Sequence, residues 1–134
     1  MAGYSGTPLA KKLGIKEDMP LAVLNAPSGY ASWLRPLPEG VSIGSRVRPK
    51  TAAVHFFTTT RRDLERVLPR LRNTVDTAGF VWVSWPKQSS GLATDVTEDT
   101  IRAVALPLGF VDVKVCAVTD VWSGLKLVVR KSER

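Results

Sequence analysis

The chain is poor in cysteine and histidine, with one of each among 134 residues. The single cysteine, Cys116, cannot form an internal disulfide, which favours a cytoplasmic location. This scarcity also excludes a zinc site built from the usual cysteine and histidine ligands, so we expect no metal. No apolar run approaches the ~18 residues of a membrane span, and the first residues lack the apolar segment of a signal peptide. We therefore expect neither of these segments, and no membrane partner.

The chain also lacks a glycine-rich phosphate-binding loop. The apolar run PLAVLNA, residues 20–26, is typical of a buried strand, and residues 25–30 read NAPSGY. A dinucleotide-binding fold has GxGxxG here because only glycine lets the backbone approach a pyrophosphate, whereas this loop has Gly29 alone and a proline that removes a donor. Asn25 could still hydrogen-bond a ligand, and Ser28 with Gly29 could present N–H groups at a helix start. The simpler interpretation is a structural turn.

Positive charge is abundant, with a formal net charge of +7, while 44% apolar and 23% charged residues are ordinary for a globular domain. The basic residues come in small groups separated by acidic ones, which favours a solvated surface. Nucleic-acid binding is the alternative, and it requires the groups to merge into one face. The residues concerned are Arg46, Arg48, Lys50, Arg61, Arg62, Arg66 and Arg70.

Capping residues and apolar periodicity predict alternating strands and helices. Helices are expected over 7–14, 28–34, 60–75 and 95–106, and strands over 20–26, 40–49, 51–59 and 78–85, with two more in 109–131 about a turn at Thr119-Asp120. The expected N-caps are Thr7, Ser28, Thr60 and Asp95, the last in a capping box with Glu98, and Pro69 should kink or split its helix. Gly79 should form the turn into its strand.

Strands separated by helices imply a mostly parallel sheet in one compact α/β layer structure. We expect a single domain over residues 1–134, with residues 1–19 as an N-terminal helical segment packed on the sheet. Strict alternation in the first strand of the terminal pair would place Asp112, Lys114 and Cys116 on one face, as in a charged edge strand.

The second half resembles the C-terminal half of class I, S-adenosylmethionine-dependent methyltransferases, through AAVHFF, an arginine-rich helix, TAGFVWVSWPK, another helix and a terminal hairpin. Nearly the whole chain is also similar to a family of small bacterial domains of unknown function, through GTPLAKKLGI, LNAPSGY, WVSWPK and DVKVCAVTDVWSGLKLV. The resemblance implies a degenerate, three-layer Rossmann-like fold. Its six-stranded sheet would have the order 2-1-3-4-6-5, with strand 6 antiparallel. It implies no activity.

In that topology the carboxyl ends of the parallel strands and the start of strand 6 share one edge, where ligands of open α/β sheets bind. Residues 25–30, 58–62, 84–90 and 120–123 should meet there, with Trp85-Pro86-Lys87 beside Trp122-Ser123. The candidate ligand-binding residues are Asn25, Ser28, Gly29, Thr58, Ser84, Trp85, Lys87, Ser89, Ser90, Trp122 and Ser123.

Two interpretations of these residues stay open. Lys87, Ser89 and Ser90 could cradle an anion, or they could belong to a flexible polar loop before a capped helix. Trp85 and Trp122 could stack on a flat ligand, or they could close the core as lids.

The expected chemistry is sparse. The resemblance implies a cofactor loop with an acidic residue and a GxGxG turn, and an acid for the ribose after the second strand; NAPSGY and the basic SRVRPK supply neither, so we expect no S-adenosylmethionine. HFFTTT also lacks the Asn/Asp-Pro-Pro-aromatic motif of amino-methyltransferases. His55 should be a buried, hydrogen-bonded histidine and Cys116 an inert thiol, and we assign no catalytic residue.

Three functions follow. We favour a non-catalytic methyltransferase-like domain that binds a protein partner or a small anionic ligand at the carboxyl edge of its sheet. The second is a divergent transferase that uses the 84–95 loop. The third is a basic nucleic-acid-binding accessory protein.

Overall fold

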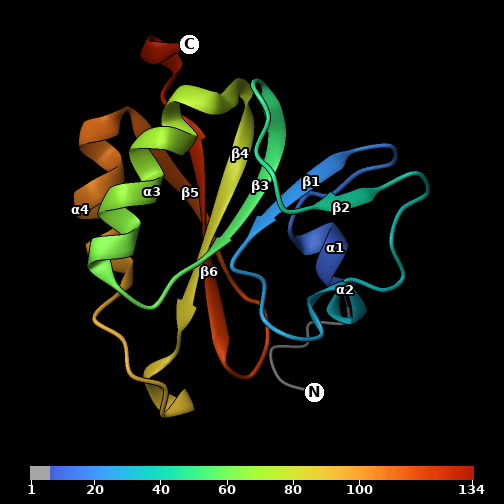
Figure 1. The fold of residues 1–134 in the computed structure, drawn as a ribbon, viewed down its shortest axis with the longest axis horizontal. Helices are drawn as coiled ribbons and strands as arrows, with labels where there is room; N and C mark the ends of the chain where they lie inside the picture. Colours follow the sequence, from blue (N-terminus) through green and yellow to red (C-terminus); the bar gives the residue numbers. More distant parts are fainter. Residues whose placement is uncertain (1–6) are drawn as a thin grey trace.

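The computed structural model describes residues 7–134 as a six-stranded sheet between two helical layers (Figure 1). In chain order the elements are α1 (Leu9–Lys12), β1 (Pro20–Leu24), α2 (Tyr30–Trp33), β2 (Ser42–Gly44), β3 (Thr51–Phe57), α3 (Arg61–Thr74), β4 (Val75–Pro86), the 3-10 turn η1 (Gln88–Ser90), α4 (Glu98–Ala105), η2 (Leu106–Leu108), β5 (Phe110–Ala117), β6 (Trp122–Val129) and η3 (Lys131–Glu133). Among these residues, no helix has both the length and the apolar character needed to cross a bilayer.

The sheet has the order β2-β1-β3-β4-β6-β5. The first four strands pair in parallel, and β6 runs antiparallel to both β4 and β5. The expected fold class, strand order and reversed sixth strand are confirmed. The carboxyl ends of β1, β3 and β4 therefore lie on the same edge as the start of β6, and we call this edge the rim.

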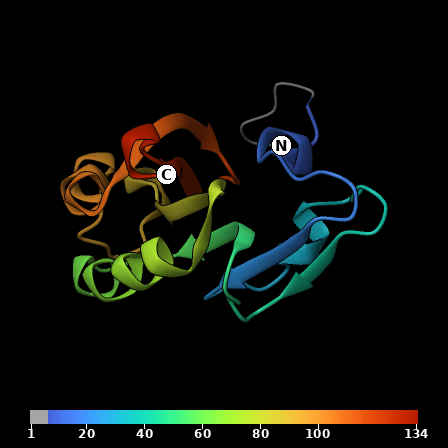
Figure 2. The ribbon, with the colours of Figure 1, turned by 90° about the horizontal axis from the view of Figure 1, so that it is seen from above.

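Helices cover the two faces of the sheet unequally (Figures 1 and 2). On the α3/α4 face, the long helices pack over β3, β4 and β6, and the core includes Leu64, Leu68, Ile101, Phe110 and Leu125. On the α1/α2 face, two short helices pack over β1, β3 and β4, and the core includes Leu13, Tyr30, Leu34, Phe57 and Trp82. The connection from β2 to β3 contains no helix, so none covers β1 and β2 on the α3/α4 face.

The N-terminal segment joins the sheet through Trp82. The indole Nε1 of this fully buried side chain donates to the carbonyl oxygen of Leu13 at 2.8 Å. Leu13 follows α1, whose N-cap is Pro8 and not the expected Thr7. Gly14 ends the turn with φ +79°, as the sequence predicts. Residues 1–6 of the expected segment 1–19 lie outside the described part.

α3 follows the sequence closely. Thr60 caps it by accepting a hydrogen bond from the backbone N–H of Asp63 at 3.1 Å. Pro69 was expected to kink or split the helix, but the helix continues unbroken to Thr74. Pro69 removes one backbone donor only, and buried leucines on both sides of it hold the helix to the sheet.

Two further expected caps, Ser28 and Asp95, are also wrong, because other residues occupy the N-cap positions. α2 begins after Gly29 at φ +85°, so the side chain of Ser28 does not cap it. α4 begins after Thr97, whose Oγ1 accepts from the N–H of Thr100 at 3.2 Å, while the Thr100 Oγ1 accepts from the N–H of Thr97 at 3.1 Å. Asp95, expected to cap α4, instead accepts from the N–H of Arg61 at 2.7 Å and so caps α3 from another segment.

The capping box of α4 gives a direct test. Thr97→Ala should lower the free energy of unfolding by about 1 kcal/mol, because the N–H of Thr100 loses its acceptor. Thr97→Ser keeps the hydroxyl and should stay near wild type. Urea denaturation of the three proteins measures the difference, and equal losses in both variants would assign the effect to the methyl group instead.

The strand pairing is irregular at two places, in β4 and in β5. β4 begins at Val75, earlier than predicted, and its pairing with β3 slips between Thr51 and Ala53. Gly79 was expected to form the turn into this strand but lies inside it, at the irregularity. A Cβ there would sit 2.4 Å from the carbonyl oxygen of Ala52, so the strands can approach only at a glycine.

The second irregularity is a bulge in β5. Its pairing with β6 slips between Asp112 and Lys114, and Val113 is the extra residue. Asp112 pairs with Leu127 on the α3/α4 face, whereas Lys114 pairs with Lys126 on the opposite face. The expected shared face of Asp112, Lys114 and Cys116 is therefore wrong for Asp112, because strict alternation fails across a bulge.

Candidate functional site

The rim brings together the four segments expected there. The Asn25 Nδ2 after β1 donates to the carbonyl oxygen of Phe57 at 3.1 Å, and the N–H of Thr58 donates to the carbonyl of Ser84 at 3.0 Å. Trp85 pairs with Ser123 and Pro86 with Trp122, so these segments are neighbours as predicted. Ser123, half-buried, is part of this β4–β6 ladder.

Polar groups at the rim are tied to one another through Asp63, which the sequence analysis did not single out. Its Oδ2 accepts from the Asn25 Nδ2 at 3.4 Å and from the Thr58 Oγ1 at 3.3 Å. Its Oδ1 accepts from the Arg66 Nη2 at 2.5 Å. Thr58 also donates to the carbonyl of Thr60. This cluster joins the ends of β1 and β3 to the first turn of α3.

The turn after β1 closes on itself. The N–H of Tyr30 donates to the carbonyl of Pro27 at 3.2 Å, and Ser28 and Gly29 are exposed on the turn. α2 has only four residues, and Ser45 and Arg46 follow β2 where the resemblance implies an acid for a ribose. These residues do not fit S-adenosylmethionine in the mode that the resemblance implies, so no reaction step is assigned to it.

Several polar groups of the 84–95 loop form hydrogen bonds within the loop or to the neighbouring segment. The Ser90 Oγ donates to the carbonyl of Lys87 at 2.6 Å and accepts from the N–H of Leu92. The N–H of Gly91 donates to the carbonyl of Gln88. Ser89 is exposed, and the N–H of Lys87 donates to the carbonyl of Val121 at 2.8 Å. Of the candidate anion-binding groups, the Ser90 hydroxyl and the Gly91 N–H therefore already hold the loop in shape.

Trp85 and Trp122 lie on opposite faces of the sheet. Trp85 belongs to the core under α3 and α4, whereas Trp122 packs edge-on against Phe57 at a centroid distance of 5.1 Å on the other face. The two indoles therefore cannot stack on one flat ligand. Their positions correspond to lids over the two cores.

A buried hydrogen-bonded chain crosses the α1/α2 face. The His55 Nδ1 lies 2.7 Å from the Tyr30 hydroxyl, and its Nε2 lies 2.7 Å from the Ser84 Oγ. Burial lowers the pKa of His55 to about 3 and raises that of Tyr30. Serine beside histidine is the pattern of an activated nucleophile, but His55 and Ser84 are both 0% exposed, so no substrate reaches them. His55 is the buried, hydrogen-bonded histidine that the sequence predicts.

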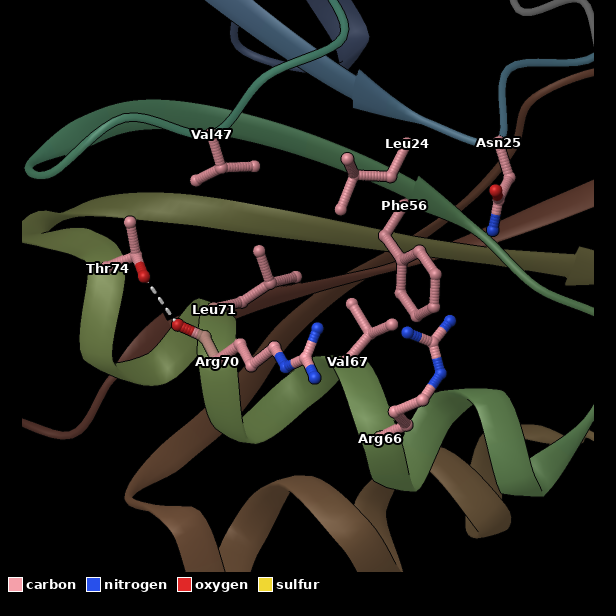
Figure 3. Close-up of a pocket in the computed structure, with 9 residues that line it drawn as sticks. All are labelled: Leu24, Asn25, Val47, Phe56, Arg66, Val67, Arg70, Leu71 and Thr74. Atoms are coloured by element: carbon pink, nitrogen blue, oxygen red, sulfur yellow. Dashed lines mark hydrogen bonds between the residues drawn. The ribbon is translucent and has the colours of Figure 1, made fainter.

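A groove on the α3/α4 face begins at Asn25 on the rim and runs along α3 (Figure 3). It lies where no helix covers β1, and its volume is about 380 Å³. Leu24, Asn25, Val47, Phe56, Arg66, Val67, Arg70, Leu71 and Thr74 line it. Figure 3 shows the guanidinium group of Arg66 directed from α3 toward Phe56, while the side chain of Arg70 extends along α3 toward Val67.

The two arginines differ in their partners. Arg66 is ion-paired with Asp63, whereas Arg70 has no ion-pair partner among residues 7–134. Both side chains belong to residues exposed at the surface, so the groove combines accessible positive charge with apolar side chains. Such an arrangement suits an organic anion.

The basic residues proposed for nucleic-acid binding do not all lie on one face. Arg46 and Arg48 line a different hollow of about 530 Å³ over β1 and β2, and the N–H of Lys50 donates to the carbonyl of Thr74 at the end of the groove. Arg61 instead forms an ion pair with Glu65 on the other side of α3. Arg62 is exposed and lines neither hollow.

Sequence reasoning found Asn25, Arg66 and Arg70 but missed the apolar half of the groove. Val47 faces α3 from the segment between β2 and β3, and Val67 lies at the side of the buried stripe of α3. The one available signal was the lack of a helix between residues 40 and 51, which leaves apolar side chains of β1 and β3 uncovered.

Comparison with solved structures shows the fold. A SAM-dependent methyltransferase from Aquifex aeolicus matches with a TM-score of 0.69 and 11% identity, over 95% of this chain and 91% of that one. A protein described as a type 11 methyltransferase, from Sulfolobus solfataricus, gives 0.66 and 13%, over 100% and 96%. Aeropyrum pernix fibrillarin, solved with natively bound S-adenosyl-L-methionine, gives 0.61 and 12%, over 94% and 70%. No family model and no curated protein matches this sequence. The chain therefore has a methyltransferase-like fold.

Proposed function

We propose that this chain is a non-catalytic methyltransferase-like domain that binds a small organic anion in the groove between α3 and β1. The ligand would carry an apolar body and a carboxylate, sulfonate or phosphate group. The observation that supports this most directly is that Arg66 and Arg70 line the same groove as apolar side chains such as Leu24 and Val67.

The dimensions and chemistry of the groove agree with such a ligand. Its volume of about 380 Å³ lies within the roughly 300–1,000 Å³ typical of small-molecule sites, which are mostly apolar with a few polar groups. Guanidinium groups bind carboxylates and phosphates through paired, charge-assisted hydrogen bonds. Because the groove starts at Asn25, this proposal extends the expected rim site along α3.

Three observations support a binding role over chemistry at the rim. His55 and Ser84 are sealed in the core, the hydroxyl of Ser90 is bound within its own loop, and the turn after β1 does not fit the cofactor of the fold's relatives. We accordingly propose that S-adenosylmethionine is not its ligand. We also propose that the chain belongs with the small bacterial domains it resembles and works in the cytoplasm.

The alternatives keep specific support. The transferase hypothesis retains the hollow of about 370 Å³ beside the 84–95 loop, but its one cation, Arg102, is ion-paired with three carboxylates. The nucleic-acid hypothesis retains the arginines of both hollows over β1. An acidic protein partner would use the same arginines, whereas the experiments below separate a small anion from the cofactor and from nucleic acid.

The groove can be tested with 8-anilinonaphthalene-1-sulfonate, a fluorescent anion with an apolar body. We expect saturable binding to the native protein and at least about tenfold weaker binding to Arg66→Gln/Arg70→Gln, because charge-assisted hydrogen bonds contribute about 1.5–3 kcal/mol each. Arg62→Gln, an exposed arginine on the same helix outside the groove, is the matched control and should bind as wild type does.

Three outcomes would contradict the proposal. Equal affinity in wild type and the double variant would place the probe elsewhere. Thermal-shift measurements with S-adenosylmethionine and a short RNA duplex complete the test. A shift with the cofactor would restore the methyltransferase, and a salt-sensitive shift with RNA would favour the nucleic-acid function.

A further inference from the structure

A second basic cluster lies on the α1/α2 face, away from the groove. Lys114 of β5 and Lys126 of β6 stand directly opposite each other in the antiparallel ladder. The chain around α1 brings Lys12 and Lys16 to the same region, since Lys114 donates to the carbonyl of Lys12 at 3.3 Å and Lys16 acts electrostatically on Lys126. We call these four residues the lysine cluster.

Contacts hold the lysines in place. The Lys126 Nζ lies 4.7 Å from the centroid of the Phe80 ring, and the backbone at Gly14 packs against it, since a Cβ there would be 3.5 Å away. Lys126 is half-buried, and its pKa is lowered by burial and then by the charges of Lys114 and Lys16. Lys114 and Lys126 are therefore held close together as like charges, with Lys16 near enough to add to the repulsion.

The bulge at Val113 removes the acid that would have balanced these charges. Regular alternation would put Asp112 on the face of Lys114, but the bulge turns it to the other face, where Arg102 binds it at 2.9 Å. Among residues 7–134, no ion pair uses Lys114 or Lys126. Like charges directly opposite in a sheet are destabilising. An anion bound between them would relieve this repulsion.

We propose that the lysine cluster binds an anion that carries two or more phosphate groups. Lysine ammonium groups bind phosphate as point charges with several donors each, and Lys114 uses one of its three donors on the carbonyl of Lys12. The cross-strand spacing of about 5 Å brings two such groups within reach of adjacent phosphates. The neighbouring Cys116 has its pKa raised by burial, so its thiol adds no opposing charge at neutral pH. This site is independent of the arginine groove.

The test uses pyrophosphate with wild type, Lys114→Gln, Lys126→Met and the control Lys131→Gln, an exposed lysine in η3. Without anion, we expect Lys126→Met to melt at or above the wild-type temperature, because repulsion is relieved and the apolar stem over Phe80 is kept. With pyrophosphate, we expect wild type and Lys131→Gln to be stabilised, and both cluster variants to bind at least tenfold more weakly by calorimetry. Lys114→Gln changes an exposed residue and keeps a donor, so it should fold in either case.

Further arms identify the source of the phosphate groups. Inorganic phosphate, tripolyphosphate and a nucleoside diphosphate are compared at one ionic strength, and the cluster should favour the compounds with adjacent phosphates. Arg66→Gln/Arg70→Gln should leave the response to pyrophosphate unchanged, so failure here is distinguishable from failure of the groove. Equal pyrophosphate affinity in wild type and both cluster variants, or no pyrophosphate binding to wild type, would overturn the proposal.

Discussion

Lowering the pH from 7 to 5 is expected to reduce the free energy of unfolding by about 2 kcal/mol through His55 alone. Burial holds the pKa of this side chain near 3, compared with 6.5 in an unfolded chain. Both ring nitrogens are already hydrogen-bonded, to Tyr30 and Ser84, in a core without access to water. A charged imidazolium would be buried there away from water, which is unfavourable.

The sign follows from proton binding. Between pH 6.5 and about 3, the unfolded chain binds a proton at His55 that the native protein does not, so acid favours unfolding in this window. The stabilisation is complete above pH 6.5 and is lost as the pH falls toward 3, by up to about 1.4 kcal/mol per pH unit. Above pH 7, the histidine should contribute no further pH dependence.

Urea denaturation at a series of pH values measures the effect, with His55→Gln as the variant that cannot titrate. The difference in stability between the two proteins should shrink steadily below pH 6.5. Should the variant fail to fold, the imidazole resonances of the wild type provide an independent measurement. A histidine in the native protein that titrates near pH 6.5 would contradict the prediction.

Trp82→Ala should cost about 3–5 kcal/mol, which is enough to unfold many domains of this size. Trp82 is fully buried in the core of the α1/α2 face, and its indole is the hydrogen-bonded link between β4 and the segment that follows α1. Truncation would remove both the packing under α1 and the partner of the Leu13 carbonyl.

Trp82→Phe separates these two contributions. Phenylalanine keeps most of the apolar contact but has no N–H, so it should cost roughly 1–3 kcal/mol, less than alanine. Hydrogen exchange should then show faster opening around α1 than in the strands of the α3/α4 core. If both variants lose the same stability and exchange uniformly, the indole does not anchor the N-terminal segment.

The sequence predicts what local chemistry decides. Thr60 precedes an apolar stripe and caps α3 as expected, and the order of strands and helices leads to the observed sheet. Prediction from the sequence fails where a side chain forms a hydrogen bond with a distant segment. Asp95 and Thr97 are both suitable N-caps for α4, and Asp95 binds the N–H of Arg61 only because its loop approaches α3. Pattern alone cannot show which helix end a carboxylate will reach.

The sequence predicted which segments meet at the candidate site but not how their side chains are oriented. Convergence of Asn25, Thr58 and Trp85 on one edge follows from topology. The opposite orientations of Trp85 and Trp122 follow from register, which the sequence leaves open. The groove forms because no helix lies between β2 and β3. The identities of Val47 and Val67 alone do not predict that these residues line a groove.

The bulge in β5 also bears on solubility. β5 is the last strand of the described sheet, and its side chains Val113 and Val115 are 54% and 47% exposed. A regular strand with valines on its surface would be a template for pairing with a second chain and for fibrous aggregation. The extra residue interrupts the row of backbone donors and acceptors, and Lys114 adds charge between the valines. The irregularity that separates Asp112 from the lysines thus also protects the open edge of the sheet from self-association.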